Sequence, residues 1–448
     1  MPTPFPTPFP PATHAEWLSQ VQKDLKDSNV YEGLRWSSPE GFTVEPYYTA
    51  EQMEANTAAT IQQAQKNAPG WLNTPAYSVT SGNEKGLNAS LRDAILNGAE
   101  ALVLHMASQS GDEFALSRLL DGIKLSSTPI FFKLATGVDA GQFLQLLKQV
   151  APYQLRGGLL SDAGTLPTAV LADLISQGSE SPTFRTIGIS SHDFHTAGAT
   201  ATQELAFTLA RLAETYAQLI EAGLSIEQLI SKTMLSVSVG TSYFMEMAKL
   251  RALRVLVARL YPAATGQSIL LHCQTSTFYE AAATPYTNLL RATTEAMAAV
   301  IGGADALTVR PYDAVLAVPR PSTSGEFSER IARNVSTMLK AESYLDKVAD
   351  PAAGSYYIEN LTQQLVDAAW DLFHHVQDMG GLTKAMEAGY VQQELDKSYA
   401  ANVEAVRAGR VLVGVTKFRH DEEGAEANPE PGNNAPGTAN RRLASEFE

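Results

Sequence analysis

Three titratable side chains, His192, Asp193 and His195, stand close together directly after the short apolar run Ile187–Ser190. Imidazole and carboxylate groups are common general acids and bases, and they also bind metals such as zinc and iron. In an extended segment, neighbouring side chains point to opposite faces, so His192 and Asp193 would diverge unless the loop turned sharply. The spacing therefore argues against a metal site, and each histidine alone is more readily explained as a structural loop residue.

Other polar residues stand where further apolar runs end. Because the strands of a parallel barrel deliver side chains to one cavity at their carboxyl ends, these residues are expected to share a barrel mouth. His272, Gln274 and Arg310 are the candidates for contacting a cofactor there. His272 also fits a buried, hydrogen-bonded histidine, and its neighbour Cys273 fits an inert packing thiol. The full set is Thr241, Ser242, Tyr243, His272, Gln274, Thr275, Ser276, Arg310, Tyr312 and Asp313.

The elements that would position these residues are short β-branched runs alternating with long amphipathic stretches. The segment Ala201–Gly223, for example, repeats leucine at helical spacing and ends on glycine. Eight strand–helix units predict a closed (β/α)8 TIM barrel rather than an open doubly wound sheet, and no GxGxxG or GxxxxGK[ST] motif opens a helix. The predicted strands are Tyr77–Ser81, Ala101–His105, Pro129–Leu134, Arg156–Ser161, Thr186–Ser190, Met234–Val239, Ser268–Cys273 and Ala306–Val309.

The composition is that of a soluble globular protein, with 448 residues, 44% of them hydrophobic. The formal net charge of −15 and the absence of Lys/Arg runs argue against a nucleic-acid partner. A single cysteine cannot form an internal disulfide, and no N-terminal segment combines basic residues with an apolar stretch. We therefore expect a cytoplasmic protein with no membrane partner.

The two ends differ in composition from the rest. Met1–Thr13 contains six prolines interleaved with phenylalanines, and it predicts an extended arm that is either a disordered tail or a strip docked on a partner. Asp421–Asn440 is acidic and rich in Gly, Pro and Asn, which predicts a linker. The expected division is an N-terminal arm and helical extension over 1–70, a barrel over 71–420 and a linker over 421–448.

Several sequence words resemble the methylmalonyl-CoA mutase family. They run from residue 197 to 381, and VLVGVTKFRHDEEG at 411–424 extends them. The resemblance implies a TIM barrel from a family that interconverts methylmalonyl-CoA and succinyl-CoA by adenosylcobalamin radical chemistry. The words are AGATATQELAFTLA (197–210), FMEMAKLRALR (244–254), HCQTS (272–276), RATTEAMAAVIGG (291–303), RIARN (330–334), VADPAAGSYYIE (348–359) and DMGG (378–381).

The chain departs from the catalytic members of that family at chemically distinct points. Asp193 stands where they carry the histidine that faces the substrate thioester, and an ionised carboxylate cannot donate a hydrogen bond there. Asp305 corresponds to a glutamine near the adenosyl group, which the resemblance places in the loop after the eighth strand. The family's tyrosine-bearing motif and its substrate-carboxylate arginine have no clear counterpart, and no DxHxxG supplies a histidine for cobalt.

These departures make the chain most similar to the small, non-catalytic subunit of heterodimeric mutases, as does YYTAEQ at 47–52. The implied partner is a large catalytic subunit that binds the adenosylcobalamin, while this chain is inactive alone and needs no cofactor. Its site would be vestigial, with Asp193 left as an unpaired carboxylate. Two alternatives stay open: an acid–base barrel enzyme using Asp193, His192 and Asp305, or a CoA-ester binding module without turnover, which an open mouth would favour.

Overall fold

The computed structural model describes residues 12–26, 28–53, 55–106, 113–264, 269–317, 325–421 and 440–448. Residues 1–11 of the proline-rich arm and residues 422–439 of the expected linker lie outside these residues, as does Ser268, so the predictions made for them stay predictions. A strand lies at each of the eight predicted segments, with ends that differ by at most two residues.

The strands form two parallel five-stranded sheets that together make the predicted eight-stranded barrel. One sheet has the order β3-β12-β11-β10-β9, and the other has the order β4-β5-β6-β7-β8. The strands of the two sheets are β3 (Leu72–Asn73), β4 (Ala76–Val79), β5 (Leu102–Met106), β6 (Ile130–Leu134), β7 (Gly157–Leu159), β8 (Phe184–Arg185), β9 (Ile187–Ser190), β10 (Thr233–Val239), β11 (Leu270–Thr275) and β12 (Ala306–Thr308).

The two sheets meet at two seams where one extended segment serves both. Thr74 and Pro75 separate β3 from β4, and the Thr74 amide still bonds to the Leu307 carbonyl at 2.9 Å. Thr186 alone separates β8 from β9. The first and fifth barrel strands each therefore appear as two short strands, because each changes its neighbour partway along.

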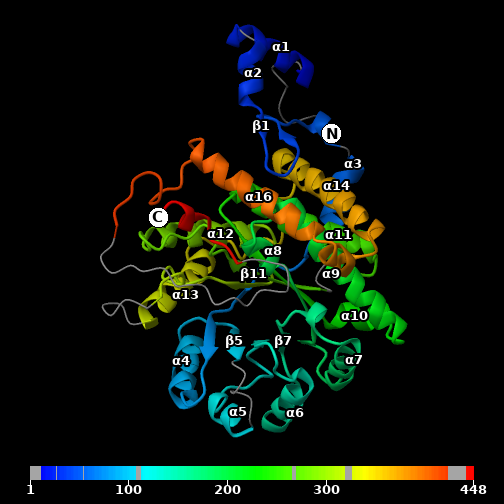
Figure 1. The fold of residues 1–448 in the computed structure, drawn as a ribbon, viewed down its shortest axis with the longest axis vertical. Helices are drawn as coiled ribbons and strands as arrows, with labels where there is room; N and C mark the ends of the chain where they lie inside the picture. Colours follow the sequence, from blue (N-terminus) through cyan, green and yellow to red (C-terminus); the bar gives the residue numbers. More distant parts are fainter. Residues whose placement is uncertain are drawn as a thin grey trace, which may run out of the picture.

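Helices cover the outside of the barrel, as the amphipathic stretches predict (Figure 1). Thr200 begins α9 with a capping box, in which its side chain accepts from the Gln203 amide and the Gln203 side chain accepts from the Thr200 amide. No described helix combines the length and apolarity that crossing a bilayer requires. The barrel helices are α4 (Glu84–Leu96), α5 (Glu113–Leu119), α6 (Ala140–Val150), α7 (Thr168–Gln177), α8 (His192–Thr196), α9 (Ala201–Glu221), α10 (Ile226–Lys232), α11 (Tyr243–Leu260), α12 (Thr287–Ile301) and α13 (Gly325–Ala341).

The N-terminal extension projects from one end of the molecule (Figure 1). Its helix α3 packs against α11 and α14, whereas α1, α2 and the two-stranded β1–β2 ribbon stand away from the barrel. The extension comprises α1 (His14–Leu25), α2 (Ser28–Leu34), β1 (Trp36–Ser37), β2 (Thr43–Val44), the 3-10 turn η1 (Ala50–Gln52) and α3 (Ala55–Ala64).

Three more helices follow the barrel: α14 (Tyr356–Asp378), α15 (Leu382–Glu387) and α16 (Tyr390–Arg407). The chain ends in the 3-10 turn η3 (Leu443–Glu446), where Leu443 is fully buried against Phe278 and its amide bonds to the Phe278 carbonyl at 2.8 Å. The last residues of the expected linker over 421–448 are therefore packed against the barrel, contrary to that part of the prediction.

Candidate functional site

The inside of the barrel changes from apolar to polar along the strands. Its apolar layer consists of Ala76, Val103, Phe131, Leu160, Met234, Leu270 and Ala306. Side chains alternate between the two faces of a strand, so the residue two positions further along also points inward. Those positions hold Ser78, His105, Lys133, Asp162, Ser236, His272 and Thr308. We call this ring the polar layer; it lies toward the carboxyl ends of the strands.

Solvent reaches the polar layer. Ser78 and Lys133 are exposed although they point into the barrel, and His105 is only half-buried. Side chains that filled the barrel to its mouth would bury all three. The upper interior is therefore open to water, which is the arrangement expected of a barrel that admits a ligand.

His192 belongs to a chain of neutral hydrogen-bonded groups that crosses the polar layer. Its Nδ1 lies 2.7 Å from Ser238 Oγ, and its Nε2 lies 2.8 Å from Ser236 Oγ. His272 continues the chain, with Nδ1 at 2.8 Å from Ser236 Oγ and Nε2 at 2.9 Å from Thr308 Oγ1. Burial lowers the pKa of His272 to about 3 and lowers the pKa of His192 well below its ordinary value. Both imidazoles are therefore neutral, with no free ring nitrogen.

Asp193 is tied into an ion pair. The segment that carries it is the short helix α8 rather than an extended strand, so Asp193 turns outward to Arg211 on α9. Arg211 holds it with two bonds of 3.0 and 2.7 Å, bonds Asp162 at 2.8 Å, and lies 4.3 Å from the centre of the Phe194 ring. Burial raises the pKa of Asp162 to about 6. The expectation that Asp193 is unpaired is wrong, because the sequence pattern gave no sign of its partner.

The pairing reverses the expected effect of Asp193→Asn. An unpaired carboxylate would be relieved by this change, but here it leaves Arg211 with weaker compensation in a buried place. We expect the free energy of unfolding to fall by about 1–2 kcal/mol, as measured by urea denaturation at pH 7. Asp371→Asn, which changes an exposed aspartate on α14, is the matched control. Unchanged or increased stability in Asp193→Asn would contradict the ion pair.

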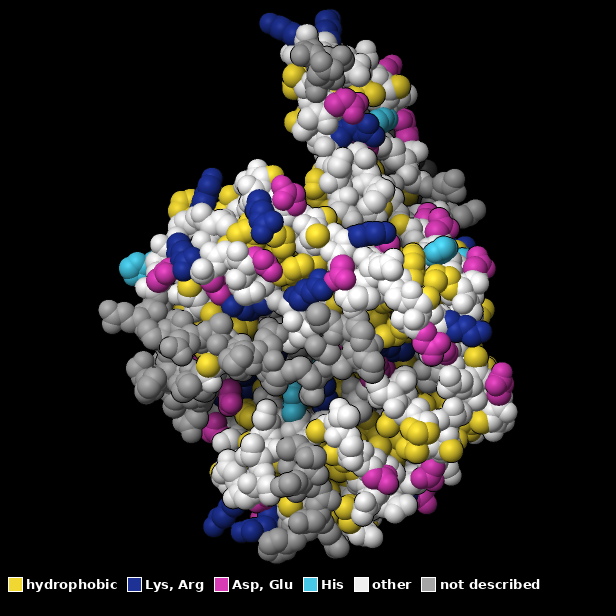
Figure 2. All heavy atoms as spheres, viewed as in Figure 1, with side chains coloured by type: hydrophobic (Ala, Val, Ile, Leu, Met, Phe, Trp, Pro, Cys, Tyr) yellow, Lys and Arg dark blue, Asp and Glu magenta, His cyan; other side chains and the backbone are white. Residues whose placement is uncertain are grey.

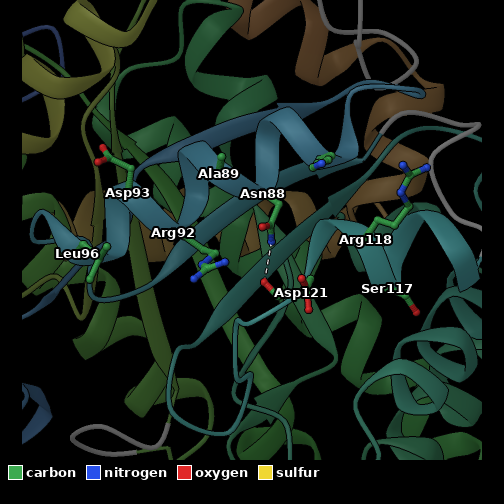
Figure 3. A pocket seen from close by; sticks show the side chains of 9 residues that line it. Asn88, Ala89, Arg92, Asp93, Leu96, Ser117, Arg118 and Asp121 are labelled. Atoms are coloured by element: carbon green, nitrogen blue, oxygen red, sulfur yellow. Dashed lines mark hydrogen bonds between the residues drawn. The ribbon is translucent and has the colours of Figure 1, made fainter.

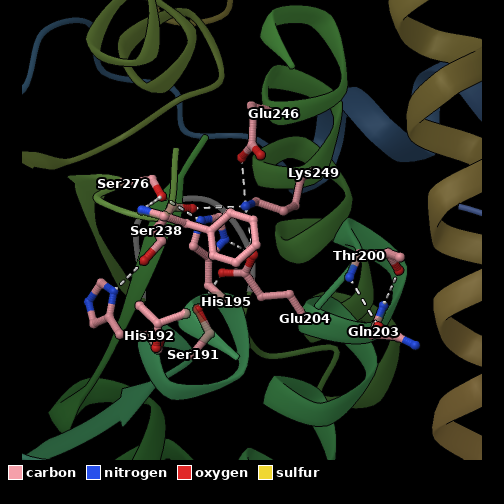
Figure 4. A network of polar contacts seen from close by, with 12 residues as sticks. Ser191, His192, His195, Thr200, Gln203, Glu204, Ser238, Glu246, Lys249 and Ser276 are labelled. Atoms are coloured by element: carbon pink, nitrogen blue, oxygen red, sulfur yellow. Dashed lines mark hydrogen bonds and ion pairs between the residues drawn. The ribbon is translucent and has the colours of Figure 1, made fainter. Parts of the chain in front are cut away.

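His195 is part of a second set of buried polar contacts, which Ser238 joins to the first because the Lys249 ammonium donates to its carbonyl (Figure 4). Its Nε2 lies 2.7 Å from Ser276 Oγ and its Nδ1 lies 3.1 Å from Glu204 Oε2. Lys249 Nζ bonds to the same Glu204 oxygen at 2.8 Å and to Glu246 at 2.6 Å. Burial opposes ionisation of Glu204, but the Lys249 ammonium and the His195 ring hold its pKa well below its usual range.

The order Ser276, His195, Glu204 is that of a serine-hydrolase triad, yet the arrangement is structural. All three residues are buried, and Glu204 is shared with the Lys249 ammonium. The network joins α8, α9, α11 and the end of β11. Sequence reasoning missed Glu204, Lys249 and Arg211, although a charged residue on the apolar face of a helix is a signal that could have indicated them.

Asp305 lies at the opposite end of the barrel from Asp193. It precedes β12, so it is at the amino end of the eighth strand and not in the loop after it, which corrects the expectation from the resemblance. Arg254 donates to it at 2.8 Å, Lys66 Nζ lies 3.7 Å away, and the Leu271 amide also donates to it. Asp193 and Asp305 therefore cannot act together on one substrate.

The remaining mouth candidates are Gln274 and Arg310, which stand beyond the polar layer and are half-buried. The Arg310 amide bonds to Thr275 Oγ1 at 2.7 Å, but its guanidinium has no hydrogen-bond partner among the described residues, and Nε is buried. Cys273, fully buried between strands and helices, has a raised pKa because of that burial.

The described ranges contain no group of three His, Cys, Asp or Glu side chains that could hold a metal ion. An open groove of about 680 Å³ lies on the outer face between α4 and α5 (Figure 3). Its lining includes Asn88, Arg92 and Arg118, and none of the residues singled out from the sequence borders it. This groove and the barrel mouth are thus separate features.

Comparisons with known proteins bear on the whole chain. Residues 168–443 match the family model described as methylmalonyl-CoA mutase. The methylmalonyl-CoA mutase small subunit of Porphyromonas gingivalis is 31% identical over 92% of this chain and 70% of its own length. The methylmalonyl-CoA mutase of Rhizobium meliloti is 30% identical over 92% of this chain and 64% of its own length. Dihydropteroate synthase from Thermus thermophilus aligns with 61% of this chain and 95% of its own, at 13% identity and a TM-score of 0.34, which is too low to carry an argument.

Proposed function

We propose, from the premise that this chain belongs to the methylmalonyl-CoA mutase family, that it is the small subunit of a heterodimeric mutase and is itself inactive. The observation that carries the proposal is the state of Asp193. The resemblance assigns this position to a histidine that faces the thioester, and here the side chain is a carboxylate held by Arg211. Asp193 accepts hydrogen bonds from Arg211, so its side chain is not placed to donate one to a substrate oxygen as the histidine would.

The histidines at the mouth do not fit a cobalamin site on this chain. A cobalt ligand needs a free imidazole nitrogen, but both ring nitrogens of His192, His195 and His272 are hydrogen-bonded. The His105 ring makes no hydrogen bond to another described residue, yet it points into the polar layer beside Lys133. We therefore assign adenosylcobalamin to the partner chain and derive no chemical step through it here.

The N-terminal extension supplies a surface for the proposed partner. Its projecting part exposes Val30, Leu34, Trp36 and Tyr47, which are between 42% and 51% accessible. Apolar and charged side chains are interspersed on this part of the molecule (Figure 2). Large exposed apolar side chains on a segment that makes few contacts with its own barrel are typical of a protein–protein interface. The proposed complex would be cytoplasmic.

The acid–base alternative is weakened by the positions of its residues. Asp193 and Asp305 lie at opposite ends of the barrel, and His192 is a neutral link between two serines. A CoA-ester binding module without turnover remains the second candidate, because the upper interior of the barrel is open to water.

Co-expression with the mutase large subunit of the source organism tests the proposal. We expect the two chains to co-elute in size-exclusion chromatography and the complex to interconvert methylmalonyl-CoA and succinyl-CoA. The purified chain alone should show background turnover with adenosylcobalamin, and its addition should not change the cobalamin absorption spectrum. Turnover by the chain alone, or separate elution of the two chains, would contradict the assignment.

Charged substitutions separate the interface from the fold. Trp36→Glu should weaken co-elution with the large subunit by placing a charge in a desolvated contact, while the melting temperature of the isolated chain stays nearly unchanged because Trp36 is 42% exposed. Leu96→Glu, at an 85% exposed position on α4, is the control that should leave assembly intact.

A further inference from the structure

Two cations in the upper barrel interior lack compensation. Lys133, on β6, points into the polar layer, and Arg310 follows β12 two residues beyond Thr308 of the same layer. Neither the Lys133 ammonium nor the Arg310 guanidinium has a hydrogen-bond or ion-pair partner in the part of the chain that is described, and Arg310 Nε is buried. Lys133 lies within the barrel although solvent reaches it. Its partial removal from bulk water, and then the charge of Arg310, lower its pKa, so the two cations act on each other.

The nearby carboxyl groups do not neutralise this pair. Asp162 and Asp193 are bound to the buried Arg211. Glu280 attracts Arg310, but burial raises the pKa of Glu280 to about 8, so most of it is protonated at neutral pH. Arg310 is half-buried with its Nε buried, and a cation without a counter-charge in such a place costs free energy.

Neutral donors stand beside the cations. His105 lies one strand from Lys133, paired with it across the β5–β6 ladder, and its ring makes no hydrogen bond in the described part of the chain. Ser78 is paired with His105 in the next ladder and is exposed. Carboxylate and phosphate oxygens accept hydrogen bonds from such a set of donors: an ammonium, a guanidinium, an imidazole N–H and a hydroxyl.

We propose that the upper barrel interior binds a small oxyanion, a carboxylate or a phosphate group, between Lys133 and Arg310. Lys133 lies on β6 and Arg310 lies just after β12, and these strands are on different sides of the barrel, so the anion would sit near the barrel axis. Solvent access to Lys133 gives the ligand a route in. This site does not depend on assembly with a mutase large subunit.

Thermal unfolding of the full chain with inorganic phosphate or succinate, against sodium chloride at equal ionic strength, tests the site. We expect a saturable rise in Tm with at least one of the two probes, since a ligand that binds only the folded state stabilises it. Stabilisation by phosphate alone identifies a phosphate ligand, and stabilisation by succinate alone identifies a carboxylate. Lys133→Met and Arg310→Met should each weaken the apparent affinity by about tenfold or more.

The variants also separate binding from folding. Without any probe, Lys133→Met and Arg310→Met should melt at or above the temperature of the unmodified chain, because each removes a repelling cation that holds no partner. Lys85→Met, on the outer face of α4, should keep the full response to the probe. Equal Tm in phosphate, succinate and chloride, an undiminished response in Lys133→Met and Arg310→Met, or a marked loss of Tm in them without a probe would overturn the proposal.

Discussion

Replacing Glu204 by glutamine is expected to cost about 3–5 kcal/mol of folding free energy, because the buried Lys249 ammonium would then keep only Glu246 as a carboxylate partner among the described residues. Lys249 and Glu204 are 2% and 3% exposed, so solvent cannot screen the loss. With an unfolding entropy of about 2.1 cal/mol/K per residue, the melting temperature should fall by about 3–6 °C. Scanning calorimetry or urea denaturation at pH 7 measures the change.

A double-mutant cycle attributes the loss to the pair. Glu204→Gln combined with Lys249→Met removes both charges, so it should cost less than the sum of the two single changes. Glu221→Gln changes an exposed glutamate at the end of the same helix and is the matched control. Additive effects of the two single changes would show that Glu204 and Lys249 do not interact.

Glu280→Gln should raise stability above neutral pH. Glu280 is 1% exposed, and its Oε2 has no hydrogen-bond partner among the described residues. Burial raises its pKa from 4.5 to about 8, although the positive charges of Arg310 and Arg291 act to lower it. Glutamine resembles the protonated acid, so the variant avoids ionising a buried group. At pH 9 we expect it to be more stable than the unmodified chain by about 3–5 kcal/mol.

The sign of this pH dependence follows from the direction of the shift. A carboxyl group whose folded-state pKa is raised contributes stability that is fully present below its unfolded pKa, near 4.5, and is lost as pH rises through about 8. The difference between the two proteins should therefore be small at pH 4.5 and grow to its limit above pH 8. Urea denaturation at both ends of that range measures it.

Exposed Glu342 on the loop after α13 is the control for that measurement. Glu342→Gln should change stability little and equally at pH 4.5 and pH 9. A stability difference between Glu280→Gln and the unmodified chain that did not depend on pH would show that Glu280 ionises normally.

The barrel could be predicted from the sequence because most strands are short apolar runs that are followed by a segment with helical periodicity. The two seams could not be predicted from the sequence. Pro75 cannot donate to a strand ladder, and Thr186 is one residue within a continuous extended segment. The change of neighbouring strand at each seam therefore depends on barrel closure rather than on local propensity.

The candidate site was predicted in its location but not in its chemistry. His192 and Asp193 do stand at a carboxyl end, but their partners Ser236, Ser238 and Arg211 come from other elements. Arg211 lies 18 residues after Asp193, within a helix whose leucines dominate the pattern. A pairing across elements leaves no periodic trace, so sequence reasoning treated Asp193 as unpaired.

The polar layer illustrates the opposite case. Lys133 was not singled out, although its place two residues after the buried Phe131 on a predicted strand would have put it inside the barrel. Alternation along each run, applied once the eight strands were assigned, could have identified the lysine, the histidine at 105 and the serine at 78 together.

The two seams bear on how the chain acquires its structure. The sheet β4-β5-β6-β7-β8 is assembled from strands consecutive in the sequence, so each pairing closes only a short loop. The other sheet needs β3 to find β12 at the far end of the barrel sequence, as the Leu72–Ala306 and Asn73–Leu307 pairs require. Contacts close in sequence form sooner than remote ones. The half over residues 76–185 can thus organise early in synthesis, and the ring can close only after residue 308 has been made.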